Sequence, residues 1–218
     1  ANHDFQFMIE QDLAFASYIP YYFKKWIEQI DTNVLPLVSK RIINNTCKIL
    51  NFNYTDTLER AYKVPAENIL YIHGKALSSK KLVVGHHDIS TFQYGAVSPF
   101  NAAEEHEIYI QDDDEDFRIT ETKEIIKAYF QKTYKDTFGI IQMNQNFFDS
   151  LININEIFIL GHSLSSVDMD YFVEIRKRVL HSCKWYISYF SESDLDNMEY
   201  FAKRLDIKNF QPVMLSNL

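Results

Sequence analysis

Glycine and cysteine are both scarce in this chain. Only five of the 218 residues are glycine, which argues against a glycine-rich phosphate-binding loop within the sequence. The two cysteines, Cys47 and Cys183, have no motif spacing, so a disulfide scaffold is not predicted and a reducing cytoplasm is favoured. No apolar run could span a bilayer and no signal-peptide pattern opens the chain, so we expect a cytoplasmic protein without membrane contact.

Most of the negative charge is concentrated in one segment. The net charge is -8, but residues 104–116 hold eight acidic side chains and no Lys or Arg. The rest of the chain is near neutral, and nothing in it favours binding to nucleic-acid phosphates. We interpret residues 104–116 as a solvated loop and do not expect nucleic acid as a partner.

Apolar patterning predicts an α/β fold, with residues 1–218 as a single domain. Residues 1–45 read as a helical segment whose aromatic stripe, including Trp26 and Ile30, is expected in the core. Residues 88–155 read as an irregular, acidic and helical insertion. We predict strands over 48–52, 69–72, 81–84, 156–160, 185–190 and 212–215, and helices from 57 to near 62 and over 121–138, 167–181 and 195–205. Short apolar strands separated by helices indicate a mostly parallel sheet with helices on both faces.

Three of these strands end in polar turns, where open α/β sheets bind ligands. After the first, Asn53 can present amide groups to a sugar hydroxyl or to water. Asp56 and Glu59 have the spacing of a helix-capping box, which would account for both carboxylates. After the second, His73 could act as a general base and Gly74 allows close backbone approach, although a histidine at a strand end is more often structural.

The third turn, Gly161-His162-Ser163-Leu164-Ser165, resembles a nucleophile elbow, but Ser165 replaces the final glycine. The one later histidine, His181, lies more than ~20 Å further along the following helix at 1.5 Å per residue, so a hydrolase triad is not predicted. Ser165 and Asp168 have a capping spacing, and such a helix start suits an anionic ligand.

A metal site is an alternative use of the histidines. The candidate ligands are His73, His86, His87 and His162, with Asp56 or Asp168, but no histidine pair has the i, i+4 spacing of a zincin. No metal is expected.

Taken together, the three turns resemble the bacteriophage abortive infection AbiH family. The residues that carry this resemblance are 52–59, Ile72-His73-Gly74, and Leu160 to Leu164 followed by Asp168 and Tyr171-Phe172. AbiH proteins are in turn similar to the sirtuin-like, NAD-binding superfamily. The resemblance implies a Rossmann-like sheet and NAD, or a related nucleotide, as ligand or substrate.

Carried over by position, the resemblance implies His73 as the base and Asn53 as the group that orients the ribose or attacking water. It implies Asp56 as a further catalytic candidate. The cofactor cleft would be lined by Phe52, Tyr54, Thr55, Gly74, Gly161, His162, Ser163 and Leu164, with Asp168 supporting the third turn.

Two family features are missing from this sequence. The family opens with a strand and a Gly-Asn-Gly-Phe-Asp-type turn that would bind phosphates, and we expect this first βα unit to precede Ala1. The sirtuin Cys-x-x-Cys zinc ribbon is also missing, so a sirtuin deacylase is not predicted.

The resemblance implies a phage-defence protein that binds NAD or a related nucleotide and is expected to hydrolyse its N-glycosidic bond. The alternatives are a non-catalytic nucleotide- or protein-binding sensor and a metal-dependent hydrolase. A homo-oligomer or a phage-derived activator is the expected partner.

Overall fold

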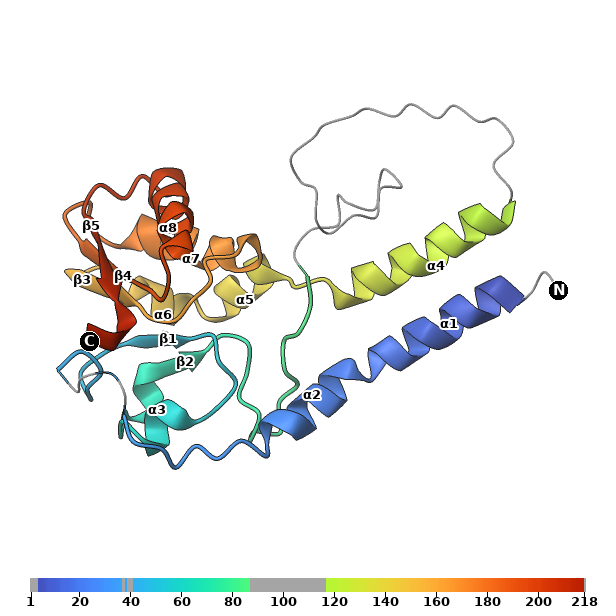
Figure 1. Cartoon of the computed structure of the whole chain (residues 1–218), viewed down its shortest axis with the longest axis horizontal. Coiled ribbons are helices and arrows are strands. Elements are labelled where there is room, and N and C mark those ends of the chain that lie inside the picture. Colours follow the sequence, from blue (N-terminus) through green and yellow to red (C-terminus); the bar gives the residue numbers. More distant parts are fainter. Residues whose placement is uncertain (1–3, 37, 39–40, 87–116, 218) are drawn as a thin grey trace. The chain divides into compact units, whose positions relative to one another are not determined.

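The structure, a computed structural model, describes residues 4–36, 38, 41–86 and 117–217 (Figure 1). The chain forms two compact units. One comprises Ala1–Lys24 and Val84–Lys135, and the other comprises Lys25–Val83 and Asp136–Leu218. The predicted acidic loop at 104–116 and His87 lie outside the described residues.

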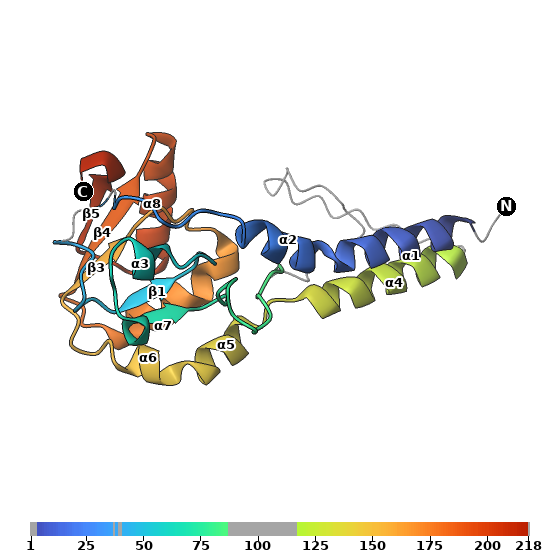
Figure 2. The ribbon, with the colours of Figure 1, turned by 90° about the horizontal axis from the view of Figure 1, so that it is seen from below.

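In the first unit, helix α1 (Asp4–Ser17) packs beside helix α4 (Phe117–Thr133), as two views show (Figures 1 and 2). Helix α4 ends five residues before the predicted boundary at 138, because Asp136 caps a new helix by accepting a hydrogen bond from the Gly139 N–H. Several large apolar side chains of α1, including Phe7, Met8 and Phe15, are exposed.

The N-terminal helical segment is shorter than predicted. Helix α2 (Ile19–Ile27) is the last helix before residue 49 among the described residues. The chain then turns, with the Asp31 carboxylate accepting the Asn33 N–H, a local bond that competes with helix continuation. The aromatic stripe is only partly core, since Ile27 is buried while Trp26 and Ile30 are 59% and 41% exposed.

The second unit contains the strands, and every pair is parallel. Strand β1 (Ile49–Asn51) pairs with β2 (Ile69–Tyr71) in one sheet. Strands β3 (Glu156–Ile159), β4 (Lys184–Tyr189) and β5 (Phe210–Met214) form a second sheet in the order β3-β4-β5. The parallel pairing is therefore confirmed, but within the described residues the strands form two sheets and not one.

The predicted strand at 81–84 is wrong. Among the described residues this segment forms no strand pairing. One backbone–backbone hydrogen bond, 2.8 Å long, runs from the Val83 N–H to the carbonyl of His73, which follows β2. Its apolar residues serve packing instead, and Leu82 is 5% exposed. A run of apolar residues thus indicated burial correctly but not conformation.

Short helices connect the strands of the second unit. Helix α3 (Thr57–Arg60) is a single turn that ends about two residues before the predicted end near 62, and it is followed by a 3-10 turn, η1 (Ala66–Asn68). The remaining helices are α5 (Thr137–Met143), α6 (Gln145–Asp149), η3 (Ser166–Asp168), α7 (Met169–Arg178), α8 (Ser193–Arg204) and η4 (Leu215–Asn217). Helices α7 and α8 confirm the predictions at 167–181 and 195–205 apart from their ends.

One hydrophobic core unites the two sheets of the second unit. Its completely buried side chains come from α6, α7, β4 and α8, and include Phe148, Tyr171, Trp185, Ile187 and Phe201. Leu50 of β1 and Leu70 of β2 pack against the same cluster. Helix α8 packs on β4 and β5. The carboxyl ends of strands from both sheets can therefore contribute to one site.

Across the described part of the chain, every helix is too short or too polar to traverse a bilayer.

Candidate functional site

The turn after β1 is held by buried polar groups. Asn51, the last residue of β1, is 6% exposed, and its side-chain oxygen accepts the Asn53 N–H at 3.0 Å. The backbone ladder continues through the Ile72 N–H to the Asn51 carbonyl. The Asn53 side chain itself is exposed. The buried amide at this strand tip is thus Asn51, a residue that the sequence did not single out.

Asp56 occupies the predicted N-cap position of α3, but its side chain does not cap the helix. Its two oxygens accept bonds from Thr32 Oγ1 and Arg60 Nε, each 2.7 Å long. Burial acts to raise the pKa of Asp56, but the bonds from Arg60 and Thr32 outweigh it and hold the pKa below its usual value. The capping box is wrong for Glu59 too, which pairs with Lys75.

Tyr54 and Thr55 complete this turn. The Tyr54 hydroxyl donates a hydrogen bond to the Val83 carbonyl at 2.9 Å, and the backbone carbonyl of Tyr54 accepts one from the Ala76 N–H. Burial, followed by the nearby Asp168 carboxylate, raises the pKa of Tyr54. Thr55 Oγ1 lies 3.0 Å from Thr57 Oγ1. These bonds fix the turn after β1 against the turn after β2.

His73 and Gly74 form the turn after β2. His73 is 4% exposed, and its Nε2 makes no hydrogen bond to any residue that the structure describes. Gly74 has φ +89°, and a Cβ there would lie 3.3 Å from the Lys81 carbonyl oxygen. Glycine is therefore required by both the backbone conformation and the close approach of the loop.

The turn after β3 contains two residues in the left-handed region, Gly161 at φ +62° and Leu164 at φ +57°. The Gly161 N–H donates to Ser188 Oγ on β4 at 2.8 Å, and Leu164 is buried. The Leu164 N–H donates to His162 Nδ1 at 2.9 Å, so the proton of a neutral His162 lies on Nε2. Ser163 is exposed. Leu164 is a non-glycine residue in a strained conformation, which is typical of functional turns.

The carboxylate of Asp168 lies between the two imidazoles. Its Oδ1 is 3.4 Å from His73 Nε2, and its Oδ2 is 3.4 Å from His162 Nε2. Both distances exceed the ~2.7–3.2 Å of an ordinary hydrogen bond. The side chains of His73, His162 and Asp168 are 5%, 11% and 15% exposed, so water screens this arrangement only weakly. The capping role predicted for Ser165 and Asp168 is wrong, since neither side chain caps a helix.

Aromatic rings surround the two histidines. The Phe52 ring makes edge contacts with His162 at 4.5 Å and His73 at 5.6 Å between centroids, and it stacks on Phe172. Tyr171 lies 5.7 Å from His73. Burial, reinforced by the Asp168 charge, raises the pKa of Tyr171. The histidine–carboxylate cluster therefore lies in apolar surroundings that strengthen its electrostatic interactions.

A pocket of about 270 Å³ opens beside this cluster. The turn after β3 contributes all four residues from Gly161 to Leu164, and the end of β4 and the first half of α8 supply further lining. His162 faces both this pocket and Asp168, whereas His73 does not line the pocket. Four of the predicted cofactor-binding residues thus share one cavity, while those of the first two turns lie outside it.

The remaining histidines do not extend the cluster. His86 belongs to the first unit, where its Nε2 is 2.9 Å from the Phe130 carbonyl oxygen. His181 contacts Arg176. Among the described residues, no group of three potential ligands is arranged to hold a metal ion.

The fold and the turns define an α/β protein with a polar site at the carboxyl ends of parallel strands. The family model for bacteriophage abortive infection AbiH matches residues 1–189, and the chain belongs to this family. Neither the curated proteins nor the solved structures include a significant match to the chain.

Proposed function

We propose that this AbiH protein acts in abortive infection by binding NAD or a related nucleotide and hydrolysing its N-glycosidic bond. The observation that supports this proposal is the Asp168 carboxylate placed 3.4 Å from both His73 and His162. A base oriented by a carboxylate is the usual arrangement for activating a nucleophile.

In the proposed reaction, His73 is the general base. Asp168 favours the tautomer with the proton on Nε2, which leaves the lone pair on Nδ1 to accept a proton from water. The water oxygen bonds to the anomeric carbon as the bond from that carbon to the base nitrogen breaks. Nicotinamide leaves as a neutral molecule, and ADP-ribose and one proton are the other products. The anomeric carbon passes through an oxocarbenium-like state, which a buried carboxylate stabilises.

The proposal includes a Rossmann-like, sirtuin-like arrangement of the strands. All paired strands are parallel, and residues of both sheets pack in one core. Ligands of such folds bind outside the carboxyl ends of the strands, where the three turns lie. In this arrangement Asn53 orients the attacking water, and Asp56 supports the first turn through Thr32 and Arg60.

One observation favours a second candidate, a non-catalytic nucleotide-binding sensor. His73 is 4% exposed, whereas a general base has to reach its substrate. If His73 is structural, the protein would bind a nucleotide and leave the effector chemistry to a partner.

The test is NAD consumption by the full-length protein, with and without phage lysate as activator. We expect release of nicotinamide by the parent and its loss in His73→Gln and Asn53→Ala. Thermal unfolding of each variant would show whether the fold is kept. Nucleotide binding by the parent with no turnover under either condition would support the sensor.

A further inference from the structure

Among the described residues, the permanently charged lining of the pocket at the turn after β3 is acidic, and the imidazole that also lines it, His162, has its Nε2 3.4 Å from Asp168 Oδ2. Asp194, in the first turn of α8, is its one acidic residue, and no Lys or Arg is present among the described residues that line it. Asp194 remains a carboxylate near neutral pH, because the Ser191 and Phe190 N–H groups donate to it and lower its pKa. A phosphate group in this pocket would therefore meet the negative charge of Asp194 without a Lys or Arg among the described lining residues to compensate it.

Asp194 also has an unused acceptor. Its Oδ2 accepts the N–H groups of Phe190 and Ser191 at 3.0 and 2.9 Å and the Ser191 hydroxyl at 3.2 Å. Its Oδ1 has no hydrogen-bond donor within the described ranges. One oxygen thus holds the carboxylate in place while the other is available to a ligand hydroxyl.

The rest of the pocket suits a sugar. Asn197 adds a side-chain amide one turn further along α8, and Met198 and Leu164, both buried, supply apolar surface. At about 270 Å³ the pocket lies just below the ~300–1,000 Å³ of sites for drug-sized ligands, so it holds part of a dinucleotide and not the whole.

We propose that this pocket binds the adenosine ribose of the dinucleotide through its free vicinal hydroxyls, and that it excludes an adenosine ribose bearing a phosphate. Asp194 Oδ1 accepts one hydroxyl and the Asn197 amide bonds the other. This inference rests on the proposed function for the identity of the nucleotide. It adds a specificity: the protein takes NAD and discriminates against NADP, which carries an additional phosphate on a ribose hydroxyl.

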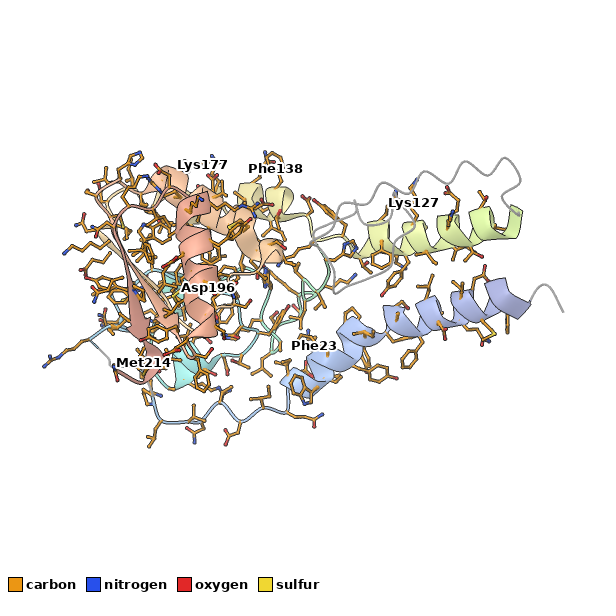
Figure 3. All side chains as sticks on the ribbon, turned by 45° about the horizontal axis from the view of Figure 1, so that its top comes forward. Phe23, Lys127, Phe138, Lys177, Asp196 and Met214 are labelled. Atoms are coloured by element: carbon orange, nitrogen blue, oxygen red, sulfur yellow. The ribbon has the colours of Figure 1, made fainter. Side chains whose placement is uncertain are left out.

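Two variants test the charge of the pocket. In Asp194→Asn the amide oxygen can still accept the Phe190 and Ser191 N–H groups, while its NH₂ group faces the pocket and can donate to a phosphate. Asn197→Lys places a cation at the same wall. The matched control is Asp196→Asn, which removes the same charge from α8 at an exposed position that does not line the pocket (Figure 3).

The measurement is calorimetric binding of NAD and of NADP to the full-length parent and the three variants. We expect the parent to bind NADP at least ~10-fold more weakly than NAD, because the additional phosphate would lie close to the Asp194 carboxylate and like charges repel. Asp194→Asn and Asn197→Lys should reduce this ratio, and Asp196→Asn should leave it unchanged.

Equal binding of the two nucleotides by the parent, or a ratio that neither pocket variant alters, would overturn the inference. Nicotinamide release is measured in parallel. Selective NAD binding without turnover would support the ribose pocket and contradict the proposed hydrolysis. Turnover of both nucleotides with equal affinity would support the proposed hydrolysis and contradict the ribose pocket. Failure to bind either nucleotide overturns both.

Discussion

Replacing Asp168 by Asn tests whether the shared carboxylate organises the site. The substitution keeps the size of the side chain and removes the charge between the two imidazoles. Because Asp168 lies 3.4 Å from a nitrogen of each histidine, both lose the same partner at once. His73 would then lack the group that, in the proposed reaction, favours the neutral tautomer with its proton on Nε2.

The contacts predict a large effect on turnover and a small one on stability. Positioned acid–base groups contribute ~10²–10⁴-fold to rates, so we expect kcat for NAD hydrolysis to fall by at least ~10²-fold. Hydrogen bonds to charged groups are worth about 1.5–3 kcal/mol, and the two contacts here are longer than ordinary hydrogen bonds. The free energy of unfolding should therefore fall by less than about 1.5 kcal/mol, the lower end of that range.

Tyrosine titration gives a readout that does not depend on activity. The Asp168 charge contributes to the raised pKa of Tyr54, so Asp168→Asn should shift the titration of Tyr54 to lower pH. The matched control, Asp206→Asn, neutralises a carboxylate that is 64% exposed and pairs with Lys208. It should change neither the Tyr54 titration nor the turnover.

If Asp168→Asn kept kcat within about 2-fold of the parent, a difference of under ~0.5 kcal/mol in activation free energy, the carboxylate would not orient a catalytic base. A shift in the Tyr54 pKa together with unchanged turnover would confirm the geometry and reject the chemistry.

Two further predictions concern stability. Gly74→Ala should destabilise the protein by about 2 kcal/mol or more, since it combines the ~1–2 kcal/mol cost of a left-handed alanine with a contact to the Lys81 carbonyl. Gly161→Ala, where no described atom lies within 4 Å of the added Cβ, should cost only the ~1–2 kcal/mol conformational term; equal losses in urea unfolding would contradict the steric argument. Asp56→Ala should cost about 2 kcal/mol by leaving Thr32 and Arg60 without their acceptor. Because folding lowers the pKa of Asp56 from 3.8, its contribution is present above that pH and is lost as pH falls through the lowered value. Acid unfolding of the parent should show this loss and Asp56→Ala should not.

The sequence predicted well those features that depend on local pattern. Runs of apolar residues located β1 to β5, and the separation of strands by helices indicated parallel pairing, which every strand pair has. Apolarity alone misplaced a strand at 81–84, where burial of Leu82 serves packing and not pairing. Similarly, the aromatic spacing predicted a first helical segment that continues beyond Ile27. In the structure the Asp31 carboxylate accepts the Asn33 N–H there, and the helix does not continue.

The candidate site depends on contacts distant in sequence, which local pattern cannot reveal. Glu59 and Asp56 fit a capping box by spacing, yet each found a partner elsewhere, Lys75 for Glu59 and Thr32 for Asp56. Asp168 likewise had the spacing of a cap. It lies between His73 and His162 after the left-handed turn at Leu164, and an aliphatic residue gives no signal of that conformation.

Val83 gives the site a mechanical connection. It is the last residue of the second unit before the chain enters the first. Its N–H bonds the His73 carbonyl, and its carbonyl accepts the Tyr54 hydroxyl. A pulling force on the chain at residue 84 therefore acts, through one covalent bond, on the two hydrogen bonds that fix His73 and Tyr54.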